Sequence, residues 1–206
     1  DAAGYLWFST RYSGIYKLDP SNYNIINYNS STHATSNLSD NDITSLLIDS
    51  TGIFWLGSWT DGVNKLDFDS FTFQKYLQHD SNPQGHRYQI LGINQDSQGR
   101  TWLAAWEHGL MEFDETTNTI IKHPLNHIDE NLIIRAIYID DEDGLWIGSN
   151  NHGLIYYEPD SKVTKVYQKD PKNEFSLNNN QVIEIISEPS GNLWIATRGG
   201  GVNYFN

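Results

Sequence analysis

The sequence predicts an all-β protein, a β-propeller of four-stranded antiparallel blades, because one short phrase recurs along the whole chain. Each copy is centred on a tryptophan, and successive tryptophans lie 44 to 48 residues apart. A glycine follows each tryptophan by seven residues, and an acid precedes each by six. The tryptophans are Trp7, Trp55, Trp102, Trp146 and Trp194. The glycines are Gly14, Gly62, Gly109, Gly153 and Gly201, and the acids are Asp1, Asp49, Asp96, Asp140 and Glu188. A period in the forties built from short strands is typical of propellers.

Each copy contains four segments with the character of β-strands. In the second copy, an apolar strand from Ile43 leads into an Asp49–Gly52 turn, in which the carboxylate can accept backbone hydrogen bonds and the glycine can take positive φ. Trp55–Ser58 forms the next strand, Val63–Asp67 alternates as a half-buried strand does, and Phe71–Tyr76 is an amphipathic outer edge. The first strand recurs at Ile90–Gln95, Ile134–Ile139 and Val182–Ser187. The second recurs at Leu6–Thr10, Thr101–Ala105, Leu145–Ser149 and Leu193–Thr197.

These copies divide the chain into three complete blades and two partial ones. We expect a partial blade at 1–40, blades at about 41–87, 88–131 and 132–179, and a partial blade at 180–206. The first copy lacks its first strand and the last copy lacks its fourth, which favours a fragment of a larger propeller. A single blade cannot bury both of its faces, so the repeated tryptophans are expected to fill the gaps between sheets, with the glycines and acids forming turns.

The composition excludes several classes of partner. The net charge of −13 opposes binding to nucleic acid and to anionic membranes, because both carry negative charge. There is no cysteine, so disulfides and thiolate metal sites are excluded. No apolar run reaches the roughly 18 residues that a spanning helix needs, so this segment is not expected to insert into a membrane. No cofactor or metal is expected, and no catalytic residue is predicted.

The residue four positions after each repeat tryptophan varies while its neighbours repeat, so packing does not dictate it. It lies in the loop between the second and third strands, on the face that also carries the long connections between blades, and such unlike loops on a rigid face are where binding sites form. The five residues are Arg11, Trp59, Trp106, Asn150 and Arg198. The tryptophans could offer platforms for sugar rings, and the arginines could bind hydroxyls or a carboxylate. The alternative is that both tryptophans fold over their own blades as additional core.

A second variable position follows two residues later. There Asp61, His108 and His152 occupy successive blades and could converge on a polar ligand or a cation. No HxH or HExxH pattern accompanies them, so ordinary surface histidines explain the same facts and no metal site is predicted.

The phrase Asn41-Asp42-Ile43, Asp49-x-x-Gly52 and Trp55-Leu56-Gly57-Ser58 resembles the two-component regulator propeller repeat, as does Gly191-Asn192-Leu193-Trp194-Ile195-Ala196-Thr197. The resemblance covers essentially the whole chain. It implies part of a seven-bladed propeller in the periplasmic or extracytoplasmic sensor region of a bacterial membrane protein. The output domain it implies is a histidine kinase or a diguanylate cyclase, and many such sensors detect glycan fragments.

Three functions therefore stay open. The first is a non-enzymatic, ligand-sensing propeller that binds an oligosaccharide or another small polar molecule and acts through adjoining blades or domains, or through a homodimer. The second is an enzyme, since Gly4-Tyr5-Leu6-Trp7-Phe8 looks like a phrase of the streptogramin lyases, although no triad or metal signature accompanies it. The third is a protein–protein scaffold without a small ligand. Because propellers serve all three, the fold cannot decide between them.

Overall fold

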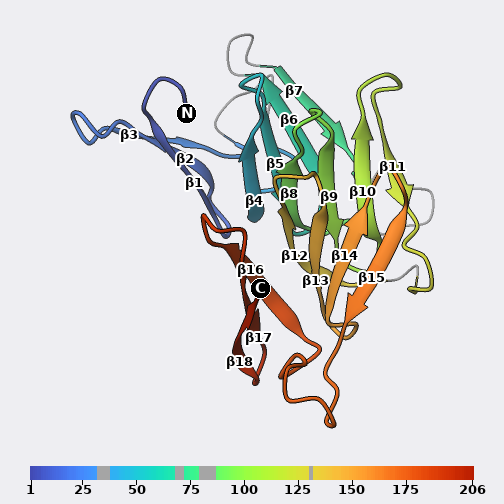
Figure 1. Cartoon of the computed structure of the whole chain (residues 1–206). Helices are drawn as coiled ribbons and strands as arrows, with labels where there is room; N and C mark the ends of the chain where they lie inside the picture. The colour runs from blue at the N-terminus through green and yellow to red at the C-terminus, as the bar shows by residue number, and fades with distance from the viewer. Residues whose placement is uncertain (32–37, 68–71, 79–86, 130–131) are drawn as a thin grey trace. The chain divides into compact units, whose positions relative to one another are not determined.

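The computed structural model describes residues 1–31, 38–67, 72–78, 87–129 and 132–206. Within these ranges it contains eighteen strands and no helix (Figure 1), which confirms the all-β prediction. The strands form five antiparallel sheets, and in each sheet consecutive strands of the chain are hydrogen-bonded neighbours. Three sheets have four strands, and the first and last sheets have three. Such meanders are propeller blades, so the predicted fold class and pattern of blades are confirmed.

The strands lie where the repeat predicts them. The first sheet comprises β1 (Leu6–Thr10), β2 (Gly14–Leu18) and β3 (Ile25–Tyr28), and the second comprises β4 (Ile43–Ile48), β5 (Phe54–Ser58), β6 (Val63–Asp67) and β7 (Thr72–Tyr76). The third comprises β8 (Ile90–Gln95), β9 (Thr101–Ala105), β10 (Gly109–Asp114) and β11 (Thr119–His123). The fourth comprises β12 (Ile134–Ile139), β13 (Leu145–Ser149), β14 (Leu154–Glu158) and β15 (Val163–Tyr167), and the last comprises β16 (Val182–Ser187), β17 (Leu193–Thr197) and β18 (Gly201–Phe205). Phe71, predicted to start a fourth strand, lies outside the described residues.

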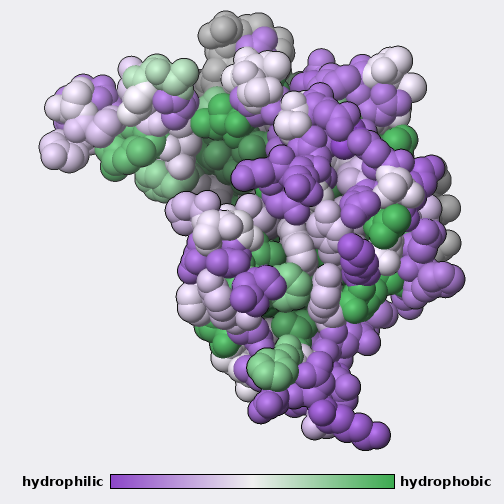
Figure 2. Space-filling model, in the orientation of Figure 1, coloured by the Kyte–Doolittle hydropathy of each residue, from purple (hydrophilic) through white to green (hydrophobic). Residues whose placement is uncertain are grey.

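The chain divides into two compact units, Asp1–Ile93 and Asn94–Asn206. The first unit holds the first two sheets, the second unit holds the last two, and the division falls within β8. The surface drawn in Figure 2 is largely hydrophilic, in keeping with the net charge of −13.

The repeat tryptophans pack each blade against the next within a unit. In the first unit, Trp7 meets Phe54 edge to face at 4.7 Å between ring centroids. In the second unit, Trp146 meets Phe205 in the same way at 5.2 Å. Trp102 is completely buried, whereas Trp194 in the last sheet is 42% exposed. The same side chain therefore contributes very different amounts of buried area in different copies.

The acid that precedes each tryptophan by six residues has two structural roles. One carboxylate oxygen of Asp49 accepts hydrogen bonds from the backbone N–H groups of Thr51 and Ile53, at 2.9 and 3.0 Å, and so forms the turn that the sequence predicts. The other oxygen accepts the indole N–H of Trp55 at 2.9 Å. The same acid-to-indole bond occurs in all five copies, at 2.6 to 3.0 Å. The acid therefore fixes the orientation of the ring that packs between blades, a role that the sequence analysis did not foresee.

These hydrogen bonds make the fold sensitive to acid. Burial alone raises the pKa of Asp49, but the bonds donated by Thr51, Trp55 and Ile53 together lower it below its ordinary value. A folded-state pKa below the unfolded one means that the carboxylate stabilises the fold above about pH 4, and that this stabilisation is lost as pH falls through the folded pKa.

We therefore expect Asp49→Asn to lower the free energy of unfolding at pH 7 by about 1.5–3 kcal/mol, because hydrogen bonds to a charged group are lost. The difference between the variant and the parent protein should shrink as pH falls from about 4, where the carboxylate of the unfolded chain takes up a proton, through the lower pKa of the folded parent. Urea unfolding at pH 7 and at pH 3 measures both quantities. A difference that stays constant across this range would show that the charge of Asp49 has no part in the effect.

The glycine that follows each tryptophan by seven residues joins adjacent blades. The backbone N–H of Gly62 donates to the carbonyl of Tyr88 at 3.0 Å, and that of Gly153 donates to the carbonyl of Asn180 at 2.9 Å. Both carbonyls belong to residues that lie just before the first strand of the next blade. Gly14 and Gly109 make the equivalent bonds to Asn41 and Leu132. The repeated glycine is therefore a point of connection between blades as well as a turn residue.

Candidate ligand site

In the second unit, the residues predicted at the variable loop position gather around Arg135. Trp106 and Asn150 each follow the second strand of their blade, and Arg135 lies between them. The guanidinium carbon of Arg135 is 4.9 Å from the centre of the Trp106 ring, within cation–π range. Its Nε donates to Asn150 Oδ1 at 2.9 Å. Loops from consecutive blades therefore meet at this arginine.

A β-bulge places Arg135 at this point. The register of β12 against β13 shifts between Ile134 and Ala136, so Arg135 is the unpaired extra residue. Its neighbours Ile134 and Ala136 are buried at 0% and 7% exposure. Bulges re-aim a side chain and occur often beside active sites. The same shift occurs in β4 and β16, where the extra residues are Thr44 and Ile183. The fold therefore offers this position in several blades, and an arginine occupies it in one.

Gln181 and Arg198 complete the group. The Gln181 side-chain amide donates to Asn150 Oδ1, so this oxygen accepts hydrogen bonds from both Gln181 and Arg135. The backbone N–H of Arg198 donates to the carbonyl of Gln181 at 2.9 Å, and that of Asn150 donates to the carbonyl of Ile133 at 3.0 Å. Asn150 and Arg198 are thus each anchored through the backbone to the residue just before the first strand of their own blade. The anchoring leaves the side chains to determine what the loops bind.

Arg135 and Arg198 carry charge that no acid among the described residues neutralises. Burial lowers the pKa of Arg135, and the positive charge of Arg198 lowers it further. No carboxylate in the described parts of the chain forms an ion pair with either residue. Arg198 is exposed, so its guanidinium is in contact with solvent. This is an unusual local excess of positive charge in a chain whose acids outnumber its bases by 26 to 13.

The first unit contains a related group that is internally neutralised. Arg11 lies 5.8 Å from the Trp59 ring, measured from its guanidinium carbon, and also pairs with Asp42 at 3.6 Å. Asp42 is buried and accepts the backbone N–H of Trp59 through its carbonyl at 2.9 Å. Asp42 stands just before a first strand, the position that Gln181 holds in its own blade. An acid in one blade thus replaces the neutral amide of the other.

The residues at the second variable position do not form a metal site in the described residues. The backbone N–H groups of Asp61 and His152 donate to the hydroxyls of Ser58 and Ser149, at 3.0 and 2.8 Å, and so belong to the turn. The ring of His152 also lies 2.9 Å from the Asn151 side-chain oxygen, measured from Nδ1. Asp61 lies in the first unit, and His108 and His152 in the second. Across the described ranges, no group of three or more His, Asp or Glu side chains is placed to hold a metal ion.

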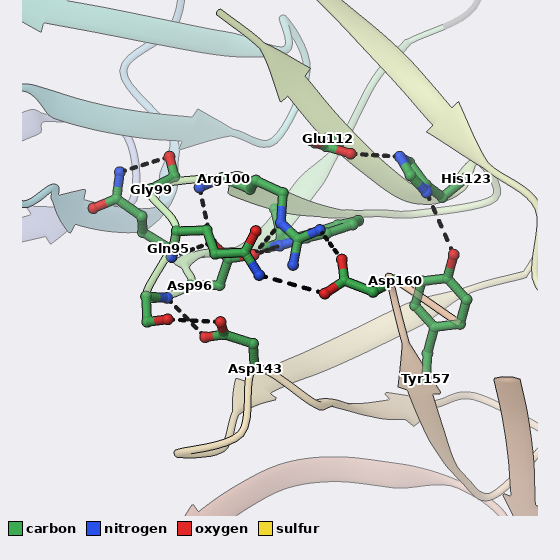
Figure 3. Close-up of polar contacts among 12 residues, drawn as sticks. Gln95, Asp96, Gly99, Arg100, Glu112, His123, Asp143, Tyr157 and Asp160 are labelled. Atoms are coloured by element: carbon green, nitrogen blue, oxygen red, sulfur yellow. Dashed lines mark hydrogen bonds and ion pairs between the residues drawn. The ribbon is translucent and has the colours of Figure 1, made fainter. Parts of the chain in front are cut away.

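A second polar cluster, drawn in Figure 3, joins the third and fourth blades. Arg100 donates through Nε to Asp96 at 2.5 Å and through a terminal nitrogen to Asp160 at 2.8 Å. The backbone N–H of Ser97 donates to Asp143 at 2.7 Å. Burial alone lowers the pKa of Arg100, but the bonds with Asp160 and Asp96 raise it overall. Because these bonds join turns of two blades and Arg100 is already paired with two carboxylates, we interpret this cluster as a cross-link between turns.

The histidine in the same view is also part of the packing. His123 lies 2.6 Å from Glu112, between Nε2 and Oε2, and 3.5 Å from the Tyr157 hydroxyl (Figure 3). Its ring meets Trp102 edge to face at 4.9 Å. Burial lowers the pKa of His123, and the Glu112 carboxylate opposes that shift. The side chains are enclosed among aromatic rings, so they stabilise the contact between sheets.

Sequence reasoning did not find Arg135, Gln181 or Asp42. One signal was present in the repeat: the position just before the first strand holds Asp42, Gln89, Ile133 and Gln181 in successive copies, although the strand that follows is always apolar. Because this residue varies while the strand beside it stays apolar, packing does not dictate it, just as packing does not dictate the residue four positions after the tryptophan. The contribution of Arg135 depends on the bulge, which the apolar pattern does not reveal.

The comparison with protein families agrees with this repeat. The model named two component regulator propeller matches residues 37–60 and 128–151. Each match runs through a first and a second strand and ends just after a variable loop residue, Trp59 or Asn150. These two segments of the chain match the two component regulator propeller repeat. The resemblance seen in the sequence is thereby confirmed.

Solved structures share the fold at low sequence identity. The extracellular domain of a hybrid two component system from B. thetaiotaomicron matches with a TM-score of 0.80 and 19% identity, over 98% of this chain and 25% of that one. A second such domain from the same organism gives 0.67 and 18%, over 98% and 32%. Virginiamycin B lyase from Staphylococcus aureus gives 0.70 and 14%, over 100% and 67%. The chain thus spans between a quarter and a third of the two-component domains. These likenesses establish the propeller fold.

No curated protein sequence matches the chain. In the described residues, no helix is long and apolar enough to cross a membrane.

Proposed function

We propose that this chain is an extracytoplasmic, ligand-sensing propeller of a bacterial signal-transduction receptor, and that it binds an oligosaccharide or another small polar ligand. The family of its repeats supports the signalling role. The shared fold with extracellular domains of hybrid two component systems supports the location. In this proposal the propeller is not itself an enzyme, and catalysis belongs to an output domain of the receptor.

The grouping of Trp106, Arg135 and Asn150 is the observation that carries the proposal. A sugar presents an apolar ring face, which packs well on an indole, and hydroxyls, which hydrogen-bond to guanidinium and amide groups. Trp106 and Asn150 stand on loops of adjacent blades with Arg135 of β12 between them, and Asn150 is held to the sheet by its backbone hydrogen bond to Ile133. Pre-organised side chains of this kind lower the entropic cost of binding.

Signalling in this proposal requires that the propeller have two arrangements of its blades and that the ligand favour one of them. A ligand shifts such an equilibrium only by as much as its affinities for the two states differ. A ligand that contacts loops of consecutive blades has this property, because its contacts depend on the spacing of the blades. The shift passes to adjoining blades or domains of the receptor, or to a second copy in a homodimer.

Calorimetry with a panel of neutral and acidic oligosaccharides tests the proposal on the 206-residue chain. We expect at least one member to bind, and Trp106→Ala to weaken that binding by about tenfold or more, as the loss of about 1.4 kcal/mol predicts. Tyr23→Ala is the matched control, since Tyr23 is an aromatic side chain that is 80% exposed and lies between β2 and β3.

Other outcomes would point elsewhere. Binding that Trp106→Ala and Tyr23→Ala leave equally unchanged would remove the site from this group of loops. No heat with any member would contradict the ligand-sensing role, and capture of a protein partner in that case would favour a scaffold. Conversion of a panel compound by the isolated chain would favour an enzyme of the lyase kind.

A further inference from the structure

We infer that the ligand of this site is anionic, a saccharide whose carboxylate or sulfate group is held between Arg135 and Arg198. This inference rests on the proposed function and specifies the chemical class of the ligand. The charges and contacts of the second unit support it, because the ligand supplies the counter-charge that the chain does not.

Two other arginines, Arg100 and Arg11, show what is missing at this site. Arg100 is bound by Asp96 and Asp160, and Arg11 is paired with Asp42. Arg135 and Arg198 have neither kind of partner among the described residues. Arg87 is exposed and also has no ion pair among the described residues, so what distinguishes Arg135 and Arg198 is that their two charges act on each other. Two neighbouring guanidiniums without a carboxylate therefore indicate a place reserved for an external anion.

The hydrogen bonds leave the guanidinium groups available for such an anion. Arg135 uses Nε for Asn150 and the face of its guanidinium plane for Trp106, and within the described residues no hydrogen bond or ion pair engages its terminal nitrogens. Arg198 is held through its backbone only. Carboxylates and sulfates bind the donors of guanidinium groups in planar, often bidentate geometry. An anion between the two arginines would also offset their mutual repulsion, which is one cause of the lowered Arg135 pKa.

The residue before the first strand sets this preference. Asp42 occupies that position beside Arg11 and neutralises it, whereas the neutral amide of Gln181 occupies it beside Asn150 and Arg198. The first unit therefore contains a counter-ion for Arg11, whereas the described residues of the second unit supply none for Arg135 or Arg198. A single acid at position 181 should convert the second arrangement into the first.

The test compares acidic saccharides with neutral partners of the same backbone. The probes are tetragalacturonate, a glucuronate-containing tetrasaccharide and a sulfated disaccharide, each measured by calorimetry beside its methyl-esterified or desulfated form. We expect the acidic member of a pair to bind at least tenfold more tightly. Equal affinity within every pair, or binding of neutral members alone, would overturn the inference and leave the proposed function standing. No binding by either class would contradict the proposed function itself.

Two variants locate the effect in the chain. Gln181→Glu keeps the size of the side chain but replaces the amide that donates to Asn150 with a carboxylate, so we expect it to reduce the affinity for acidic members about tenfold or more, and by a larger factor than the affinity for neutral members. Arg198→Gln should also reduce binding of the acidic members, and Arg11→Gln, in the first unit, is the control that should not. Equal losses for acidic and neutral members in Gln181→Glu would show that residue 181 acts through structure and not through charge.

Discussion

Replacing Trp102 with alanine is expected to lower the free energy of unfolding by about 3–5 kcal/mol, the usual cost of removing a fully buried large aromatic side chain. Trp102 has no exposed surface and packs edge to face on Tyr157 of the next blade, at 6.5 Å between centroids. Its indole N–H also donates to Asp96 at 3.0 Å. The variant therefore leaves both a cavity between blades and a buried carboxylate with one donor fewer.

Trp194→Ala is the matched control for this prediction. Trp194 occupies the same place in the repeat and makes the same bond to an acid, Glu188, at 2.6 Å, but its side chain is 42% exposed. We expect a loss on the order of 1–2 kcal/mol, since less apolar area is returned to water. Urea unfolding followed by circular dichroism measures both variants. Equal losses would contradict the view that burial between blades, and not the bond to the acid, accounts for most of the stabilisation.

Gly153→Ala is the second substitution with a large expected effect. Gly153 has a φ of 76°, and a Cβ there would lie 2.1 Å from the carbonyl oxygen of Tyr167. The left-handed conformation costs alanine about 1–2 kcal/mol, and relief of the clash by a backbone shift costs about 1–3 kcal/mol more. Such a shift would also disturb the bond from Gly153 to the carbonyl of Asn180, which joins two blades. We expect a total loss of about 2–5 kcal/mol in urea unfolding.

Gly201→Ala separates the two causes. Gly201 has nearly the same φ, 75°, but a Cβ there would meet no atom within 4 Å. Its substitution should therefore cost only the conformational part, about 1–2 kcal/mol. If Gly153→Ala and Gly201→Ala are equally destabilising, the close approach of the Tyr167 carbonyl has no energetic consequence.

The fold could be predicted from the sequence because the residues that build it are repeated. The tryptophan, the glycine and the acid recur at fixed spacing, and each marks a strand or a turn, so most strand limits follow directly. The second role of the acid was harder to predict. Asp49 is recognisable as a turn residue from its neighbours alone, but its bond to the Trp55 indole depends on how the two strands that flank the turn pair.

The candidate site could be predicted only in part, because it depends on contacts between blades. Trp106, Asn150 and Arg198 are recognisable as places where the repeat varies. Arg135 reaches Trp106 and Asn150 only because a bulge frees it from the regular pairing of β12, and Gln181 meets Asn150 across a blade boundary. Neither the bulge nor the approach of loops 31 residues apart has a signature in the order of apolar residues. The charges of Arg135 and Arg198 indicate a binding site only once these contacts between blades are known.

The central claim is that the five repeat tryptophans are structural and that ligand binding belongs to the variable loop residues. The most direct measurement is the indole N–H region of a ¹⁵N NMR spectrum of the 206-residue chain, in which the chain's seven tryptophans give one signal each. During titration with the panel member that binds, we predict a shift of the Trp106 signal, while the signals of Trp7, Trp55, Trp102, Trp146 and Trp194 keep their positions because their N–H groups stay bound to acids. Movement of the repeat tryptophans with an unchanged Trp106 signal would contradict the claim.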